Sequence, residues 1–147
     1  MKTLLISLHP RHSRNILSGK KILELRKKFP DKISEVFFYE TVPTKAIVGK
    51  FKVHHVYRDM SLDFWIEHRE YFQLTPEEIS CYLKDKYTKS NQAGCAVQVI
   101  DVEPINPVSL EKMKEVGINP PQSYTFLSPE ILEQLGIKIA GEALCNS

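Results

Sequence analysis

A chain of 147 residues, of which 42% are hydrophobic and 26% charged, is long enough to form one domain with its own core. Its formal net charge of +2 is too small to indicate nonspecific binding to nucleic acids. Three scattered cysteines without a Cys-x-x-Cys pair exclude a disulfide framework, and the apolar run at residues 3–8 is too short for a signal peptide or membrane span. We therefore expect a cytoplasmic protein without a cofactor, a metal or a membrane partner.

Positive charge is concentrated near the N-terminal end. Residues 1–30 contain one carboxylate and eight basic side chains, so they carry a formal charge of +7 and the remainder carries −5. The basic residues are Lys2, Arg11, Arg14, Lys20, Lys21, Arg26, Lys27 and Lys28. One interpretation is a basic surface that faces an anion. The alternative is that these charges lie on several solvated faces, where salt screens them beyond roughly 8–10 Å.

The first two predicted elements follow from local rules. Residues 3–8 are short, branched and apolar, which predicts a buried first strand. Residues 11–18 predict a short helix, because Pro10 suits a first helical turn and Gly19 suits a helix end.

Residues 21–27 alternate in polarity, which predicts a second strand. Its leucines lie on one face, whereas Glu24 and Arg26 share the other face. These two residues are close enough for a charge-assisted contact that would hold the guanidinium in place. The alternative is an exposed ion pair, which contributes about 0–1 kcal/mol to stability.

The middle of the chain predicts a hairpin followed by helices. Residues 35–40 and 46–57 are strand-like, and Gly49 indicates a bulge or a close backbone approach that helps a sheet to bend. Residues 61–72 have near-helical apolar spacing. The sequence Thr-Pro-Glu-Glu at residues 75–78 is a capping box, which predicts a helix to about residue 87.

The region after this helix predicts one more long element. Residues 94–102 alternate and predict a central strand, and we expect Pro104 and Pro107 to break regular structure after it. Ser109 then predicts the cap of a short helix that ends at Gly117.

The C-terminal part predicts a last strand and a last helix. Residues 120–127 run from a rigid turn into a last strand. Residues 128–136 predict a helix because Ser-Pro begins it, and the tail that follows is expected to be loose. Together the elements predict an α+β fold, a small and mostly antiparallel β-barrel of five to six strands with peripheral helices.

The stretch LLISLHPRHSRNILSGKKILELRKK resembles the start of ASCH domains, a branch of the PUA-like superfamily, in which a strand and a short helix lead into the pattern S-G-x-K-x-x-E-L-R. The stretches AVQVIDVEPINPVSL and PPQSYTFL are similar to the late strand and the final strand of that family. The resemblance covers about residues 3–127, within a predicted domain of residues 1–127, and implies a pseudo-barrel whose cleft is lined by the first helix and the second strand. Residues 128–147 are then a helical extension of the same domain.

The resemblance implies a role with nucleic acids, and the residue chemistry suggests how it would work. A carboxylate at Glu24 could accept from a base amino group, while Lys21 and Arg26 could meet phosphate or carbonyl oxygens. Prolines before Gln122 stiffen the approach to the last strand. The candidate ligand-binding residues are His9, Lys20, Lys21, Glu24, Arg26, Tyr39, Gln122, Ser123 and Tyr124.

Three functions stay open at this point. The leading hypothesis is an ASCH domain that binds RNA or a nucleotide-like ligand in a basic cleft and has a regulatory role in translation or transcription. The second is a hydrolase of RNA or a modified nucleoside, with Lys21 and Glu24 as catalytic residues. The acetylcytidine amidohydrolases of the family have a threonine at the position of Glu24, and a carboxylate cannot replace a hydroxyl nucleophile, so that activity is not expected. The third is a regulatory module for a metabolite or a protein.

Overall fold

Six strands form one curved, barrel-like sheet in the computed structural model, which describes residues 1–89 and 94–140. The strand order across the sheet is β2-β5-β4-β3-β1-β6. The strands are β1 (Lys2–Leu8), β2 (Leu23–Arg26), β3 (Ile33–Glu40), β4 (Ala46–Arg58), β5 (Cys95–Ser109) and β6 (Thr125–Leu127). Only β1 and β3 pair in parallel, so the predicted α+β fold with a mostly antiparallel sheet is confirmed.

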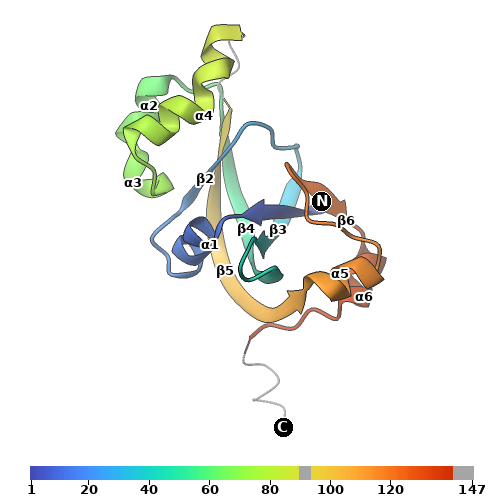
Figure 1. Cartoon of the computed structure of the whole chain (residues 1–147). Coiled ribbons are helices and arrows are strands. Elements are labelled where there is room, and N and C mark those ends of the chain that lie inside the picture. The colour runs from blue at the N-terminus through green and yellow to red at the C-terminus, as the bar shows by residue number, and fades with distance from the viewer. Residues whose placement is uncertain (90–93, 141–147) are drawn as a thin grey trace.

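Six helices surround the sheet in the described part of the chain. They are α1 (Pro10–Leu17), α2 (Leu62–Glu67), α3 (Arg69–Phe72), α4 (Pro76–Lys89), α5 (Leu110–Glu115) and α6 (Pro129–Leu135). Figure 1 shows α2, α3 and α4 gathered at the end of the molecule near β2, and α5 and α6 beside each other at the opposite end. Within residues 1–89 and 94–140, no helix has the length and apolar character needed to cross a membrane.

The turn from α1 into β2 follows the predicted signals. Gly19 adopts a φ of 84°, which ends α1 in the left-handed conformation that glycine favours. The strand β2 is shorter than predicted because the backbone N–H of Lys21 donates to the carbonyl of Asn15, and that of Ile22 donates to the carbonyl of Tyr71. The start of β2 is therefore tied to α1 and α3 before it joins the sheet.

The hairpin of β3 and β4 contains the predicted bulge at Gly49. The pairing register shifts at this residue, and a Cβ atom placed there would lie 2.5 Å from Cζ of Phe38. The close approach that the glycine indicated is therefore present, and it lets the ring of Phe38 pack against the bare backbone of β4.

The helical region differs from its prediction in one respect. The predicted helix over residues 61–72 is divided at His68 into α2 and α3. The capping box is confirmed, since Thr75 Oγ1 accepts from the backbone N–H of Glu78 and Glu78 Oε1 accepts from that of Thr75.

The prediction that Pro104 and Pro107 end the central strand is wrong. The strand β5 continues to Ser109 and pairs with β4 along most of its length, as the long curved ribbon in Figure 1 shows. A proline ends a strand only where its missing N–H would be needed for pairing, and the register shifts between β4 and β5 accommodate such residues. Pro104 lies opposite Gly49, at the bulge of β4.

The C-terminal elements pack on the same core. Ser128 caps α6, Gly136 ends it with a φ of 63°, and Leu135 is buried. The prediction of a loose tail is wrong for residues 137–140, because Ile139 bridges to Ile105 of β5. This packing supports the proposal that the region after residue 127 extends the domain; residues 141–147 lie outside the described part of the chain.

Candidate nucleic-acid site

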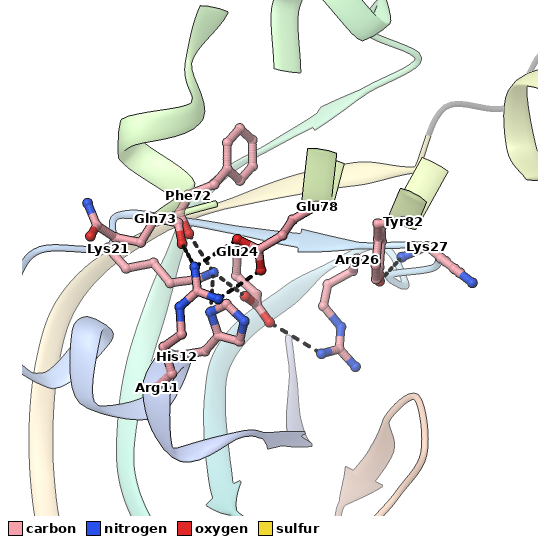
Figure 2. A network of polar contacts seen from close by, with 10 residues as sticks. All are labelled: Arg11, His12, Lys21, Glu24, Arg26, Lys27, Phe72, Gln73, Glu78 and Tyr82. Carbon is pink, nitrogen blue, oxygen red and sulfur yellow. Dashed lines mark hydrogen bonds and ion pairs between the residues drawn. The ribbon is translucent and has the colours of Figure 1, made fainter. Parts of the chain in front are cut away.

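A cleft of about 370 Å³ lies between α1, β2 and α4. Five of the predicted site residues line it, and they come from three separate parts of the chain. These residues are His9, Lys21, Glu24, Arg26 and Gln122. Figure 2 shows the polar network at its base, in which side chains of α1, β2 and the helical region converge.

Lys21 is a buried cation at the base of the cleft. Its side chain is 1% exposed, and its Nζ atom lies 2.8 Å from the carbonyl oxygen of Phe72, 3.1 Å from Glu24 Oε1 and 3.2 Å from His12 Nδ1. An ammonium group has three N–H donors, so these partners satisfy all of them. Lys21 therefore anchors α1, β2 and α3 to one another.

Glu24 lies between two cations. Its second carboxylate oxygen, Oε2, is 3.3 Å from Nη1 of Arg26. Burial alone would raise the pKa of Glu24, but the charges of Lys21 and Arg26 outweigh it and hold this pKa below its ordinary value. The predicted contact between Glu24 and Arg26 is therefore present, and the carboxylate is ionised at neutral pH.

Arg26 is the cation of this network that faces the cleft. Its side chain is 12% exposed, Nη1 contacts Glu24, and Nη2 donates to the carbonyl oxygen of Ser123. The guanidinium has more N–H donors than these two contacts use. Because Lys21, Glu24 and Arg26 together carry one net positive charge, an anion that enters the cleft is attracted to the unused donors of Arg26.

His12 is held as a neutral imidazole. Burial and then the charge of Lys21 lower the pKa of His12 to about 4. An ammonium group can only donate, so Nδ1 of His12 accepts from Lys21 and the ring proton is on Nε2. The imidazole thus completes the coordination of Lys21 without adding a charge.

The wall opposite β2 is formed by α4. Arg11 of α1 binds both carboxylate oxygens of Glu78, at 2.8 and 3.0 Å, and the hydrogen bond from Arg11 contributes most to a Glu78 pKa of about 2. Tyr82 also lines the cleft, and its hydroxyl accepts from the backbone N–H of Lys27. Figure 2 draws the contacts of Glu78 with Arg11 and of Tyr82 with Lys27, which close α4 over the second strand.

Seven lining residues were not among the predicted ones, and four of them have polar side chains. These four are Ser7, His12, Glu78 and Tyr82, and the apolar ones are Leu8, Leu25 and Leu74. The capping box located Glu78 at a helix start, but no sequence signal indicated that this helix faces α1. Ser7 has a buried hydroxyl oxygen without a hydrogen-bond partner in the described structure.

The remaining predicted site residues lie outside the lining of this cleft. Lys20 is exposed beyond Gly19, and Ser123 contributes its carbonyl to Arg26. Tyr124 packs partly against the core, with its ring edge-on to Phe126. Tyr39 is buried in the core cluster that contains Leu5 and Leu127. Ligand contact by these four residues stays a prediction.

The described residues offer oxygen and nitrogen donors for a ligand but no metal centre. Residues 1–89 and 94–140 contain no group of three or more His, Cys, Asp or Glu side chains arranged to hold a metal ion. The arrangement can bind an anion through Arg26 and can exchange a proton through His9, whose Nδ1 lies 3.4 Å from Oγ1 of Thr41. These are the groups that recognition of a phosphate ester requires.

Comparison with known proteins gives a consistent result. No family model matches the chain. A curated protein of Zymomonas mobilis subsp. mobilis, named ASCH domain-containing ribonuclease, is 28% identical over 138 residues, which cover 91% of this chain and 90% of that protein.

Solved structures agree with the sequence comparison. The crystal structure of ASCH from Zymomonas mobilis matches with a TM-score of 0.80 and 27% identity, over 92% of this chain and 94% of that one. A tyrosine-to-phenylalanine mutant of the Zymomonas protein matches with a TM-score of 0.77 and 26% identity, over 92% and 97% of the two chains. The S-G-x-K-x-x-E-L-R motif, the curved sheet and these similarities together support an ASCH domain.

Proposed function

We propose that this ASCH domain binds RNA in the cleft between α1, β2 and α4, with Arg26 as the ligand of a backbone phosphate. The observation that carries the proposal is the buried network of Lys21, Glu24 and Arg26, which has one net positive charge and reaches the cleft through a guanidinium. A guanidinium matches the geometry of phosphate oxygens, and contacts to phosphates supply most of the affinity of RNA-binding sites.

The contacts favour different roles for the three residues. The donors of Lys21 are all occupied by protein acceptors, and both oxygens of Glu24 contact cations. We therefore propose that Lys21 and Glu24 are positioning residues, which fix the guanidinium of Arg26, and that Gln122 contacts the ligand directly. The exposed Lys20 is expected to add attraction at longer range.

The binding proposal is tested with a fluorescein-labelled single-stranded RNA of ten nucleotides and fluorescence anisotropy at several salt concentrations. Arg26→Gln is expected to weaken binding by about 1.5–3 kcal/mol, the contribution of a hydrogen bond to a charged group. It should also reduce the slope of log affinity against log salt by about 0.7, the value for one phosphate of a single strand.

The matched control is Arg69→Gln, which changes an exposed arginine of α3 whose side chain donates to the carbonyl of Ile66. Equal affinities of the Arg26 and Arg69 variants would overturn the proposal. Affinity that does not depend on salt would instead favour the third hypothesis, a module for a metabolite or a protein.

We propose cleavage of the bound RNA as a second candidate function, supported by the name of the Zymomonas relative and by the imidazole of His9 in the cleft. In this reaction the 2′-oxygen attacks the adjacent phosphorus, the bond to the 5′-oxygen breaks, His9 takes the proton of the 2′-hydroxyl, and water protonates the leaving oxygen. Arg26 stabilises the charge that develops on the phosphoryl oxygens. Glu24 is a poor base here because its oxygens are engaged and its pKa is lowered.

Cleavage is tested by incubating the ten-nucleotide RNA with the protein and analysing the product ends. Products with a 2′,3′-cyclic phosphate are expected, and His9→Gln should lower their rate of formation about 100-fold or more. An RNA with a single 2′-deoxy position should resist cleavage there. If the deoxy position is cut at the same rate, the proposed reaction is rejected, while the binding proposal stands on its own measurement.

A further inference from the structure

A second groove, of about 430 Å³, lies where β6, the N-terminal end of β1 and the start of α6 meet. The aromatic residue that lines this groove is Phe126, which is 48% exposed although its neighbour Leu127 is buried. The alternation along β6, which is an edge strand of the sheet, turns the ring of Phe126 away from the core. Met1, which is 89% exposed, lines the same groove, so the two side chains form an exposed apolar patch of the kind that marks contact surfaces.

The surroundings of Phe126 combine an aromatic platform with a cation. Lys2 Nζ lies 5.0 Å from the centre of the Phe126 ring, and the ring of Tyr124 stands edge-on to it at 5.8 Å between ring centres. Among the described residues that line the groove, Lys2 carries the only charged side chain. The ammonium lies over one face of the ring, so a base that stacks on that face takes its place, and the displaced ammonium stays close enough to meet the phosphate of that nucleotide.

The groove is connected to the cleft of Arg26 by the backbone of residues 122–126. Gln122 lines the cleft, the carbonyl of Ser123 accepts from Arg26, and Phe126 lines the groove. Four residues of extended chain span at most about 14 Å. At about 3.4 Å of rise per stacked nucleotide, an RNA of roughly four or five nucleotides reaches from one site to the other.

Basic side chains lie along the loop from β2 to β3. Figure 1 shows this loop crossing from the end of β2 to the start of β3, close to the N-terminal end of β1. Lys27, Lys28 and Lys32 are exposed on it, and the carbonyl of Lys32 accepts from the backbone N–H of Lys2. Asp31, the loop's one acidic residue, forms an ion pair with Arg58. The charge of this surface is therefore complementary to a polyanion.

We infer that the Phe126 groove is a second RNA subsite, which stacks an unpaired base on the ring of Phe126 and holds its phosphate with Lys2. The inference rests on the proposed function, and it defines the substrate class as single-stranded RNA long enough to span both sites. Stacking on a ring accepts every base, so this subsite selects for unpaired RNA without selecting a sequence. A base in a stable duplex cannot reach the ring.

The test compares Phe126→Leu with Phe126→Trp by anisotropy on the ten-nucleotide single strand. The leucine variant keeps an apolar side chain but removes the ring, and it should lower affinity roughly 5- to 100-fold, the range for one lost base–aromatic stack. The tryptophan variant should bind at least as tightly as the original protein. Lys2→Gln should reduce the salt slope by about 0.7.

Tyr71→Leu is the matched control, because Tyr71 has the same exposed fraction, 48%, but lies on α3 and outside both the cleft and this groove. An equal loss for the Phe126→Leu and Tyr71→Leu variants, or no loss for either, would overturn the subsite.

Failure of the subsite is distinguishable from failure of the proposed function. If Arg26→Gln weakens binding of the ten-nucleotide RNA while Phe126→Leu does not, the cleft binds RNA and the second subsite is rejected. If the original protein has no salt-dependent affinity for the RNA, the proposed function itself is rejected. Circular dichroism spectra of each variant establish that the fold is retained.

Discussion

The buried contact between Lys21 and Glu24 leads to a quantitative prediction about stability. The two side chains are 1% and 6% exposed and lie 3.1 Å apart, so removing one charge leaves the other with little water to solvate it. Loss of one partner of a buried pair costs about 3–5 kcal/mol of the free energy of unfolding. We expect Glu24→Gln to cost about 3 kcal/mol, at the lower end, because the amide oxygen still accepts from Nζ of Lys21.

The second perturbation removes the cation instead. In Lys21→Met the charge of Glu24 stays paired with Arg26, but the carbonyl of Phe72 loses its donor. A buried polar group without a partner costs about 1–3 kcal/mol, so we expect about 2 kcal/mol for this variant. The double variant, with both Lys21→Met and Glu24→Gln, contains neither charge of the pair, so neither is left without its partner. It should therefore be about 1–3 kcal/mol more stable than the sum of the single effects predicts.

Urea denaturation at pH 7 measures the free energy of unfolding of the original protein, the two single variants and the double variant. Urea is used because, unlike guanidinium, it does not screen charges. Arg11→Gln is the control, since it breaks an exposed ion pair with Glu78 whose side chains are 51% and 37% exposed, and should cost about 0–1 kcal/mol. If the effects of the Lys21 and Glu24 substitutions on the free energy of unfolding add within about 0.5 kcal/mol, the two charges do not interact and the predicted coupling is wrong.

Three further predictions concern other parts of the fold. The ¹H–¹⁵N NMR titration of His12 should give a pKa of about 4, and a His12 that titrates near 6.5 would contradict this prediction. Between about pH 4 and pH 6.5 the unfolded chain binds a proton at His12 that the folded chain does not. The free energy of unfolding should therefore rise with pH over this range. Gly49→Ala should cost about 1–3 kcal/mol in urea denaturation, since its Cβ would overlap the ring of Phe38, and an unchanged midpoint would show that the ring moves freely. Thr75→Ala should lower stability by about 1 kcal/mol through loss of the helix cap, whereas Thr75→Ser should be nearly neutral.

Local sequence rules located most helices and strands and, within the site, the pair of Glu24 and Arg26. Pro10 and Gly19 delimit α1 because they act on their own backbone, and the alternation of β2 puts Glu24 and Arg26 on one face because that geometry holds in any strand. The same rules failed for the two prolines of β5. Whether a missing N–H donor disrupts a strand depends on its partner strand, and here the bulges of β4 accommodate it.

The order of most elements along the chain and the contact of Glu24 with Arg26 could be predicted from the sequence, since each depends on neighbours within a few residues. The burial of Lys21 and the occupation of all its donors could not be predicted, because they depend on segments that meet only in the folded protein. The carbonyl of Phe72 lies 51 residues away along the chain, and His12 lies on another element. The free energy of a buried charge depends on every group that replaces water around it, and distant segments supply those groups only after they have packed together.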